Sequence, residues 1–158
     1  MVGKIAVGGM TRTDELVLVS ILRAPNQRGL ASQALSALGN KGINLTCVTG
    51  FVDGDSLDNL SFAIACSDLD QTLGILQSLQ DEIKAENIEY QRGCSALSIY
   101  GPHFSERPAI AGRVFEVMAA ADVEILLIST SFSTVSFVTN QDQAETAVTR
   151  LQEHFLVP

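Results

Sequence analysis

The chain has 158 residues, of which 46% are hydrophobic and 18% charged, and its formal net charge is −8. This composition is typical of a globular protein and excludes an intrinsically disordered one. The negative charge argues against nucleic acids and anionic membranes as partners. No apolar run reaches the roughly 18 residues of a membrane-spanning helix. The N-terminus has no apolar leader, so the sequence predicts a cytoplasmic protein.

The first part of the chain predicts a complete βαββαβ unit. Pro25–Gly29 breaks an opening strand and precedes a helix with apolar residues at helical spacing. Asp53–Ser56 contains an Asp-Gly hairpin signal between two strands. Asp68 stands where it would cap the second helix. The predicted elements are strand 16–21, a helix from residue 30, strand 43–52, strand 59–66, a helix from residue 69 and strand 88–91.

The second part predicts the same series with one strand fewer. Its elements are strand 96–100, a helix over about 109–121, strand 123–131, strand 134–139 and a helix over about 143–155. The first part does not need the short strand Lys4–Val7, and an incomplete sheet would leave an open edge, so this strand is expected to complete the second sheet. The predicted domains are therefore 11–92, inserted, and 1–10 with 93–158. The predicted fold class is α+β: two ferredoxin-like βαββαβ units, each an antiparallel sheet with its helices on one face.

The two units also repeat each other in sequence. Residues 29–46 align without a gap on 109–126, 80 positions later. Further on the separation falls to 75 positions, where Ser61-Phe62 matches Ser136-Phe137. A shortened loop between two matching blocks indicates duplication of one small unit. Interfaces between such copies are frequent ligand sites.

Several motifs carry a resemblance to a known family. They are Pro25-Asn26-Gln27-Arg28-Gly29, Gly42-Ile43-Asn44-Leu45, Asn59-Leu60-Ser61-Phe62, Ile128-Ser129-Thr130-Ser131 and Val135-Ser136-Phe137. In order and spacing they resemble the ACT domain, a small amino-acid-sensing module. The resemblance is closest to the tandem ACT pair of aspartate kinase, which also nests its first unit inside the second.

The resemblance implies a non-catalytic module that binds lysine or threonine between the ACT units of a homodimer and inhibits a kinase catalytic domain by feedback. Helix-start N–H groups suit the effector's carboxylate, the Asn26 oxygen suits its ammonium group, and Gly29 allows close approach. The expected ligand-binding residues are Asn26, Gln27, Arg28, Gly29, Leu30, Ala31, Thr49, Asn59, Val123 and Glu124.

Three other interpretations stay open. The chain is a free-standing ACT protein with a diverged or lost effector, a purely structural dimerisation module, or a small enzyme on a ferredoxin-like fold. An enzyme would need a clustered acid, base or nucleophile, and the sequence offers none, so no catalytic residue and no cofactor are predicted.

The sequence does not predict a metal centre. The three cysteines stand far apart, and Cys47 and Cys66 lie in apolar runs that predict buried structural thiols. Asp53, Asp55 and Asp58 are spaced like calcium ligands, but an EF-hand loop needs Glu at its twelfth position, where Ile64 stands. A solvated hairpin is the preferred interpretation of these aspartates.

Overall fold

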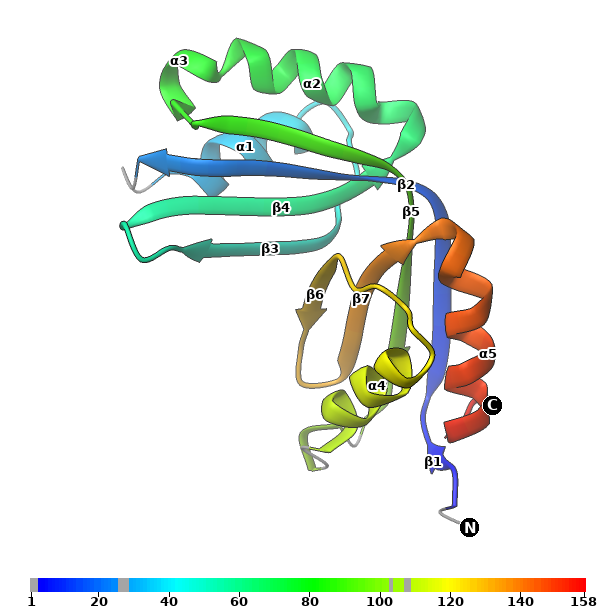
Figure 1. The fold of residues 1–158 in the computed structure, drawn as a ribbon. Helices are drawn as coiled ribbons and strands as arrows, with labels where there is room; N and C mark the ends of the chain where they lie inside the picture. Colours follow the sequence, from blue (N-terminus) through cyan, green and yellow to red (C-terminus); the bar gives the residue numbers. More distant parts are fainter. Residues whose placement is uncertain (1–2, 26–28, 103, 107–108) are drawn as a thin grey trace. The chain divides into compact units, whose positions relative to one another are not determined.

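The computed structural model describes residues 3–25, 29–102, 104–106 and 109–158 (Figure 1). The chain divides into two compact units. We call residues 15–92 the inserted unit, and residues 1–14 with 93–158 the terminal unit. The first boundary therefore follows Asp14, whereas the sequence placed it after Met10. Within the described part of the chain, no helix has the length and apolar character needed to cross a membrane.

The inserted unit contains a four-stranded sheet in the order β3-β4-β2-β5. Its helices α1, α2 and the short α3 lie on one face of this sheet (Figure 1). The long strands β2 and β5 also contribute residues to the terminal unit. The elements are β2 (Gly9–Pro25), α1 (Leu30–Gly39), β3 (Thr46–Val52), β4 (Leu57–Ala65), the 3-10 turn η1 (Cys66–Asp68), α2 (Leu69–Ser78), α3 (Gln80–Ile83) and β5 (Asn87–Tyr100).

The terminal unit has the matching order β2-β5-β7-β6, with α4 and α5 packed together on one face. Its further elements are β1 (Ile5–Ala6), η2 (Phe104–Glu106), α4 (Ala109–Ala120), β6 (Leu127–Thr130), β7 (Thr134–Asn140), η3 (Gln141–Gln143), α5 (Ala144–His154) and β8 (Phe155–Leu156). The strand pairs β2–β4, β3–β4, β5–β7 and β6–β7 are all antiparallel. The predicted α+β class, with two ferredoxin-like units, is confirmed.

Each unit has its own hydrophobic core because strand residues alternate between two faces. In the inserted unit, Val17, Val19 and Ile21 are fully buried and belong to the same cluster as Leu38 of α1 and Leu76 of α2. The terminal unit forms a separate cluster that comprises Leu97, Ile99, Phe137, Val114 of α4, Met118 of α4 and Leu151 of α5. The apolar spacing seen in the sequence thus fixes which face of each element is buried.

The strand that completes the terminal unit differs from the predicted one. The expected strand Lys4–Val7 shortens to β1, which pairs in parallel with β8 in a separate two-stranded sheet. The first residues of β2 take the fourth position of the main sheet instead. Where β2 begins, Gly9 leaves room for the Tyr100 ring, since a Cβ there would displace the Tyr100 hydroxyl end.

Other local predictions were also wrong. The two predicted strands 88–91 and 96–100 are one strand, β5, which continues through Gly93 at a φ of +69°. Asp68 makes no side-chain cap, because η1 has already brought its backbone to helical angles. Cys66 is exposed rather than buried, and Cys47 is half-buried. Strand β4 ends at Ala65 and Cys66 begins η1, so Cys66 lies outside the core.

The sequence repeat corresponds to repeated hydrogen bonds. Gly42 and Asp122, 80 positions apart, both have left-handed backbones, at φ angles of +75° and +55°. The next amide donates to a helix carbonyl in each unit: Ile43 N to Leu38 O at 3.1 Å, and Val123 N to Met118 O at 3.0 Å. Across the sheets, hydroxyl pairs also match, with Ser20–Ser61 at 2.8 Å and Ser98–Ser136 at 2.7 Å.

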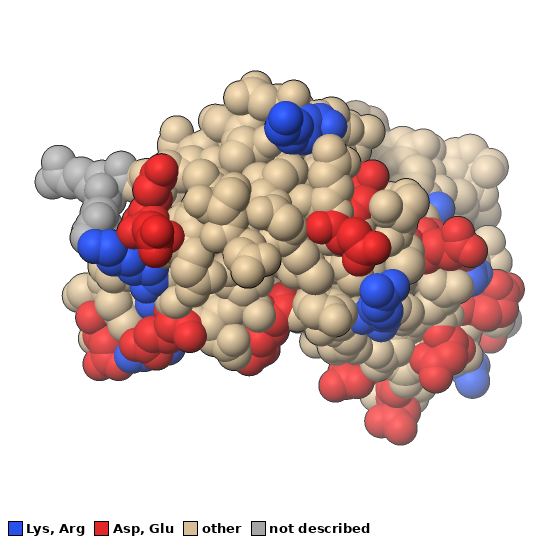
Figure 2. Space-filling view, turned by 90° about the horizontal axis from the view of Figure 1, so that it is seen from above, with Lys and Arg blue, Asp and Glu red and all other residues tan. Residues whose placement is uncertain are grey.

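The surface reflects the net charge of −8. Acidic side chains are spread over the face in Figure 2, with fewer Lys and Arg side chains between them. Such a surface favours solubility and disfavours polyanionic partners.

Candidate functional site

A cavity of about 530 Å³ lies in the inserted unit. It forms where the first turn of α1 meets the end of β3 and the beginning of β4. Antiparallel pairing of Val52 with Asp58 brings those two strand ends together across the hairpin. The lining residues are Gly29, Leu30, Ala31, Ser32, Gly50, Phe51, Val52, Asp58, Asn59 and Leu60. The volume falls within the range of roughly 300–1,000 Å³ typical of small-molecule sites.

The α1 wall of the cavity is a helix start whose N-cap residue provides no side-chain cap. Gly29 is the N-cap residue and makes no side-chain cap hydrogen bond. Its carbonyl accepts the first helical bond, from Gln33 N at 2.8 Å. First-turn N–H groups have no partner within the helix, so this wall favours a negative group.

The close approach expected at Gly29 does not depend on an unusual backbone conformation. Its φ of −177° is extended backbone that any residue adopts. A Cβ added there would meet only the Gln33 side chain, at 3.8 Å. Space beside the cavity, rather than an unusual backbone conformation, is therefore what glycine provides at this position.

Four of the ten predicted ligand-binding residues line the cavity: Gly29, Leu30, Ala31 and Asn59. Thr49 precedes the lining residue Gly50 but is not itself part of the lining. Asn26, Gln27 and Arg28 lie outside the described residues.

The two remaining predicted residues, Val123 and Glu124, belong to the terminal unit. Val123 is buried. Glu124 is bonded within its own unit: its amide donates to Gln143 Oε1 at 3.0 Å, and its carboxylate accepts from Asn140 Nδ2 at 2.8 Å. Their part in ligand binding stays a prediction.

The prediction missed most of the wall formed by the β3–β4 hairpin. The lining residues that it missed are Ser32 on α1 and, on the hairpin, Gly50, Phe51, Val52, Asp58 and Leu60. Phe51 and Val52 are exposed apolar side chains, and Asp58 is the one charged side chain among the described lining residues. The Asp-Gly signal alone does not give this register, because a two-residue loop would pair Val52 with Asp55, whereas Val52 pairs with Asp58.

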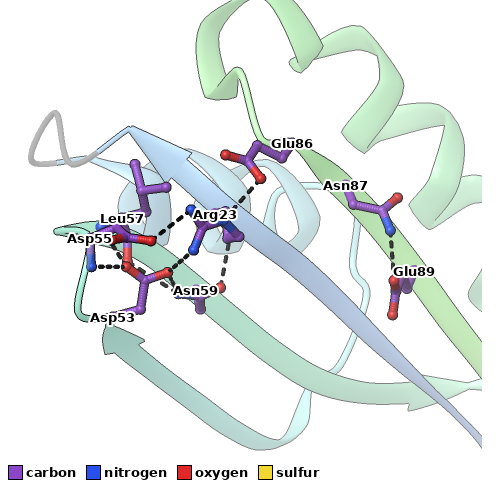
Figure 3. A network of polar contacts seen from close by, with 8 residues as sticks. All are labelled: Arg23, Asp53, Asp55, Leu57, Asn59, Glu86, Asn87 and Glu89. Carbon is purple, nitrogen blue, oxygen red and sulfur yellow. Dashed lines mark hydrogen bonds and ion pairs between the residues drawn. The ribbon is translucent and has the colours of Figure 1, made fainter.

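Asn59 is the lining residue with the most complete set of hydrogen bonds. Its Oδ1 accepts from the backbone N–H of Arg23 at 3.0 Å. Its Nδ2 donates to Asp53 Oδ2 at 3.3 Å and to the Leu57 carbonyl at 3.1 Å (Figure 3). Both amide hydrogens are thus engaged. Asn59 supports the wall rather than offering a free donor to a ligand, which revises its expected role.

Behind this wall, one arginine binds three carboxylates. Arg23 donates from Nη1 to Asp53 at 3.0 Å, from Nη2 to Asp55 at 3.0 Å and from Nε to Glu86 at 2.9 Å (Figure 3). Hydrogen bonds to Asp55 and Glu86 raise the pKa of Arg23 above its already high value. Two of the aspartates that resembled calcium ligands in sequence therefore bind a guanidinium group instead.

Asp53 also organises the hairpin itself. Its Oδ1 accepts from the backbone N–H groups of Asp55 at 2.9 Å and of Leu57 at 3.1 Å. The bond from Leu57, followed by those from Asn59 and Asp55 and by the charge of Arg23, lowers the pKa of Asp53 below its ordinary value. Asp53 therefore stays ionised to lower pH than a free carboxyl group.

The chemistry of the cavity is that of binding. The described lining residues pair no nucleophile with a base, whereas they do provide helix-start amides, one carboxylate and an apolar wall. This combination suits a small zwitterion with a short apolar part.

The chain is similar to several known proteins. The ACT domain family model matches residues 97–155. The aspartokinase of Geobacillus stearothermophilus is 30% identical over 149 residues, which are 94% of this chain and 36% of that protein. The aspartokinase of Bacillus sp. (strain MGA3) is 28% identical over 151 residues, which are 96% of this chain and 37% of that protein. The chain thus spans little more than a third of these relatives.

A solved structure of similar extent shares the fold. The ligand-free regulatory subunit of aspartate kinase from Thermus thermophilus superposes with a TM-score of 0.85 at 22% identity. The match covers 95% of this chain and 99% of that chain. Together, the matches confirm the resemblance that the sequence motifs predicted.

Proposed function

We propose that the chain is an amino-acid-sensing regulatory module. Residues 97–155 match the ACT domain family model, and nearly the whole chain resembles aspartokinases and a regulatory subunit of aspartate kinase. Its ligand is a free amino acid of the lysine or threonine class, bound in the inserted-unit cavity. The observation that carries this proposal is the cavity itself, where the start of helix α1 and Asp58 line one space.

The cavity suits the three parts of an amino acid. The α-carboxylate accepts hydrogen bonds from the first-turn amides of α1. Asp58 pairs with an ammonium group. Phe51, Val52 and Leu60 provide an apolar surface for the ligand's carbon chain. The negative charge of Asp58 would repel an acidic effector, so the cavity favours neutral and cationic amino acids.

Regulation would proceed by population shift. An effector that fits one arrangement of the regulatory module better than another favours that arrangement, and the coupling free energy is reciprocal, typically about 1–3 kcal/mol. The expected partners are a second copy of the chain and an aspartate kinase catalytic domain.

A thermal-shift screen of the twenty amino acids, followed by calorimetry, tests this function. A ligand at 100 times its dissociation constant stabilises its protein by about 2.7 kcal/mol. Lysine or threonine should raise the unfolding temperature at millimolar concentration. No shift with any of the twenty would contradict a sensor role and would favour a structural dimerisation module.

A matched pair of variants locates the site. Gly50→Val places a β-branched side chain on the cavity wall. Its Cβ alone would lie 3.4 Å from the Asn59 carbonyl oxygen and 3.4 Å from Leu60 Cδ1. Thr130→Val changes the position 80 residues later, on β6 of the terminal unit. Gly50→Val should abolish ligand stabilisation while Thr130→Val retains it. Equal binding by both variants would show that the ligand binds elsewhere.

A further inference from the structure

The strand beside the cavity wall contains a bulge. Ile21 pairs with Leu60 and Ala24 with Asp58, so β2 has one residue more than β4 between these pairs. Arg23 lies in this bulge with a left-handed φ of +57°. A bulge redirects side chains and leaves an amide without its ladder partner. Here Asn59 Oδ1 accepts a hydrogen bond from the Arg23 backbone N–H. A left-handed backbone at a residue other than glycine is strained, and such strain is frequent at functional sites.

The bulge directs the Arg23 side chain to two segments of the inserted unit. Asp53 and Asp55 come from the β3–β4 hairpin, and Glu86 from the residues between α3 and β5 (Figure 3). Glu86 also donates its backbone N–H to the Arg23 carbonyl at 3.4 Å. Arg23 thus links the hairpin to the rest of the unit, and we call Arg23, Asp53, Asp55, Asn59 and Glu86 the Arg23 cluster.

The cluster is joined to the cavity by the covalent chain. Asp53 directly follows the lining residue Val52. Asn59 is itself a lining residue, only 6% exposed, and stands between Asp58 and Leu60. Any movement of the hairpin away from Arg23 therefore displaces both strands of the hairpin wall at once.

From this geometry we propose that Arg23 is a positioning residue for the cavity: it holds the hairpin wall in its binding-competent place without touching the ligand. The proposal rests on the amino-acid-binding function proposed above. Without Arg23 the wall is in place for only a fraction of the time, and the apparent affinity falls by that fraction. The loss is one of preorganisation rather than of a ligand contact.

The energy of exposed ion pairs is too small for the Arg23 cluster to contribute much to the global stability of the chain. Asp55 is 72% exposed and Glu86 59% exposed. Exposed ion pairs contribute a median of about 0–1 kcal/mol to folding. The cluster is thus a minor part of global stability. Local opening of the hairpin breaks only this cluster and the last β2–β4 pairs, Ala24–Asp58 and Pro25–Leu57, so it is sensitive to the cluster.

The terminal unit provides an internal contrast. There the strand register runs without a shift from Cys94–Asn140 to Tyr100–Thr134. The next residue, Gly101, bonds from its backbone N–H to the Ser133 carbonyl at 2.9 Å. The bulge and its arginine therefore occur in the unit that has the hairpin-walled cavity.

Amide hydrogen exchange on the full, ligand-free chain tests the positioning role, with Arg12→Gln as the matched control. Arg12 pairs with Asp14 and Glu145 in the terminal unit. In Arg23→Gln, the Asp55 and Leu57 amides should exchange roughly tenfold faster, because the hairpin opens more often once its ion pairs to Arg23 are lost. Amides of α4 should be unchanged. Arg23→Lys keeps the positive charge but cannot bind three carboxylates at once, so it should restore the slow exchange of the hairpin amides only in part.

Calorimetry with lysine and with threonine completes the test. For an amino acid that binds the wild type, Arg23→Gln should weaken binding roughly five- to tenfold, within the usual range of coupling, and Arg12→Gln should not. Unchanged hairpin exchange, a uniform rise in exchange over both units, or unchanged affinity despite faster exchange would each overturn the proposal. If the wild type binds neither amino acid, the proposed function fails, while hairpin exchange still decides whether Arg23 fixes the wall.

Discussion

Phe62 in the inserted unit and Phe137 in the terminal unit, 75 positions apart, are both fully buried in the cores of their units. Arg23 and Gly101, at the ends of the corresponding first strands, have nothing in common: one binds three carboxylates and the other has no side chain. The duplicated units therefore agree in their cores and helix ends and differ where strand ends meet loops.

This difference shows which parts of a duplicated fold are free to diverge. Core positions are restricted by close packing, since even one methylene group changes stability. Strand ends and hairpins carry no such restriction, so a cavity walled by a hairpin and an arginine bound to three carboxylates can be formed in one copy alone. In the terminal unit, the cavity near the start of α4 is smaller, about 230 Å³, and Phe104 forms part of its wall.

Replacing the matched phenylalanines should have the largest effect on stability. Phe62→Ala and Phe137→Ala should each cost about 3–5 kcal/mol in the free energy of unfolding, because each leaves a cavity in a closed core. Phe137 also meets Phe115 edge to face, with ring centroids 6.0 Å apart, so its loss should cost about 0.5–1.5 kcal/mol more. Urea denaturation measures both. A cost below 1 kcal/mol for either would contradict the matched cores.

The two left-handed helix ends should respond in opposite directions. Gly42→Ala places a Cβ at a φ of +75° and should destabilise by about 1 kcal/mol, whereas Asp122→Gly relieves a φ of +55° and should stabilise by up to about 1 kcal/mol. Thermal unfolding gives the two signs. The same sign for both variants would mean that the repeated helix ends are not equivalent.

The matched hydroxyl pairs should have similar, smaller effects. Ser20→Ala and Ser98→Ala each remove one partner of a half-buried pair and should cost about 0.5–1.5 kcal/mol. Replacing both members, as in Ser20→Ala with Ser61→Ala, should recover part of the loss because no polar group is left unpaired. A double-mutant cycle in each unit measures this coupling, and a coupling of zero in one unit would break the equivalence.

The smallest expected effect is a dependence on acid pH. The folded pKa of Asp53 lies below its ordinary value of 3.8, so its stabilising contribution is complete above that value and is lost as the pH falls through the folded pKa. Asp14 in the terminal unit behaves alike, through hydrogen bonds from Arg12 and Ser95. Asp53→Asn and Asp14→Asn should each flatten the acid limb of the stability curve. An unchanged limb in both variants would exclude these carboxylates as its source.

Much of this architecture is predictable from sequence, because apolar periodicity decides which residues are buried. The spacing of Leu30, Ala34 and Leu38 placed α1, and the Asp-Gly signal at residues 53–54 placed the hairpin. The first-turn part of the cavity wall followed from the motif at Gly29–Ala31.

The hairpin wall and the Arg23 cluster were harder to predict because they depend on tertiary register. The apolar pattern does not indicate the bulge that shifts β2 by one residue, yet this bulge determines where Arg23 points. Likewise, the continuity of β5 through Gly93 depends on pairing with neighbouring strands rather than on local preference.

The central claim, that the inserted unit holds an amino-acid site which the terminal unit lacks, is tested most directly by backbone amide NMR during titration with lysine and, separately, threonine. The account predicts that one of them shifts the amides of Leu30–Ser32, Gly50–Val52 and Asp58–Leu60 in a saturable way, and leaves the amides at 110–112, the counterparts of Leu30–Ser32, unshifted. Shifts confined to the terminal unit, or no saturable shift with either amino acid, would contradict it.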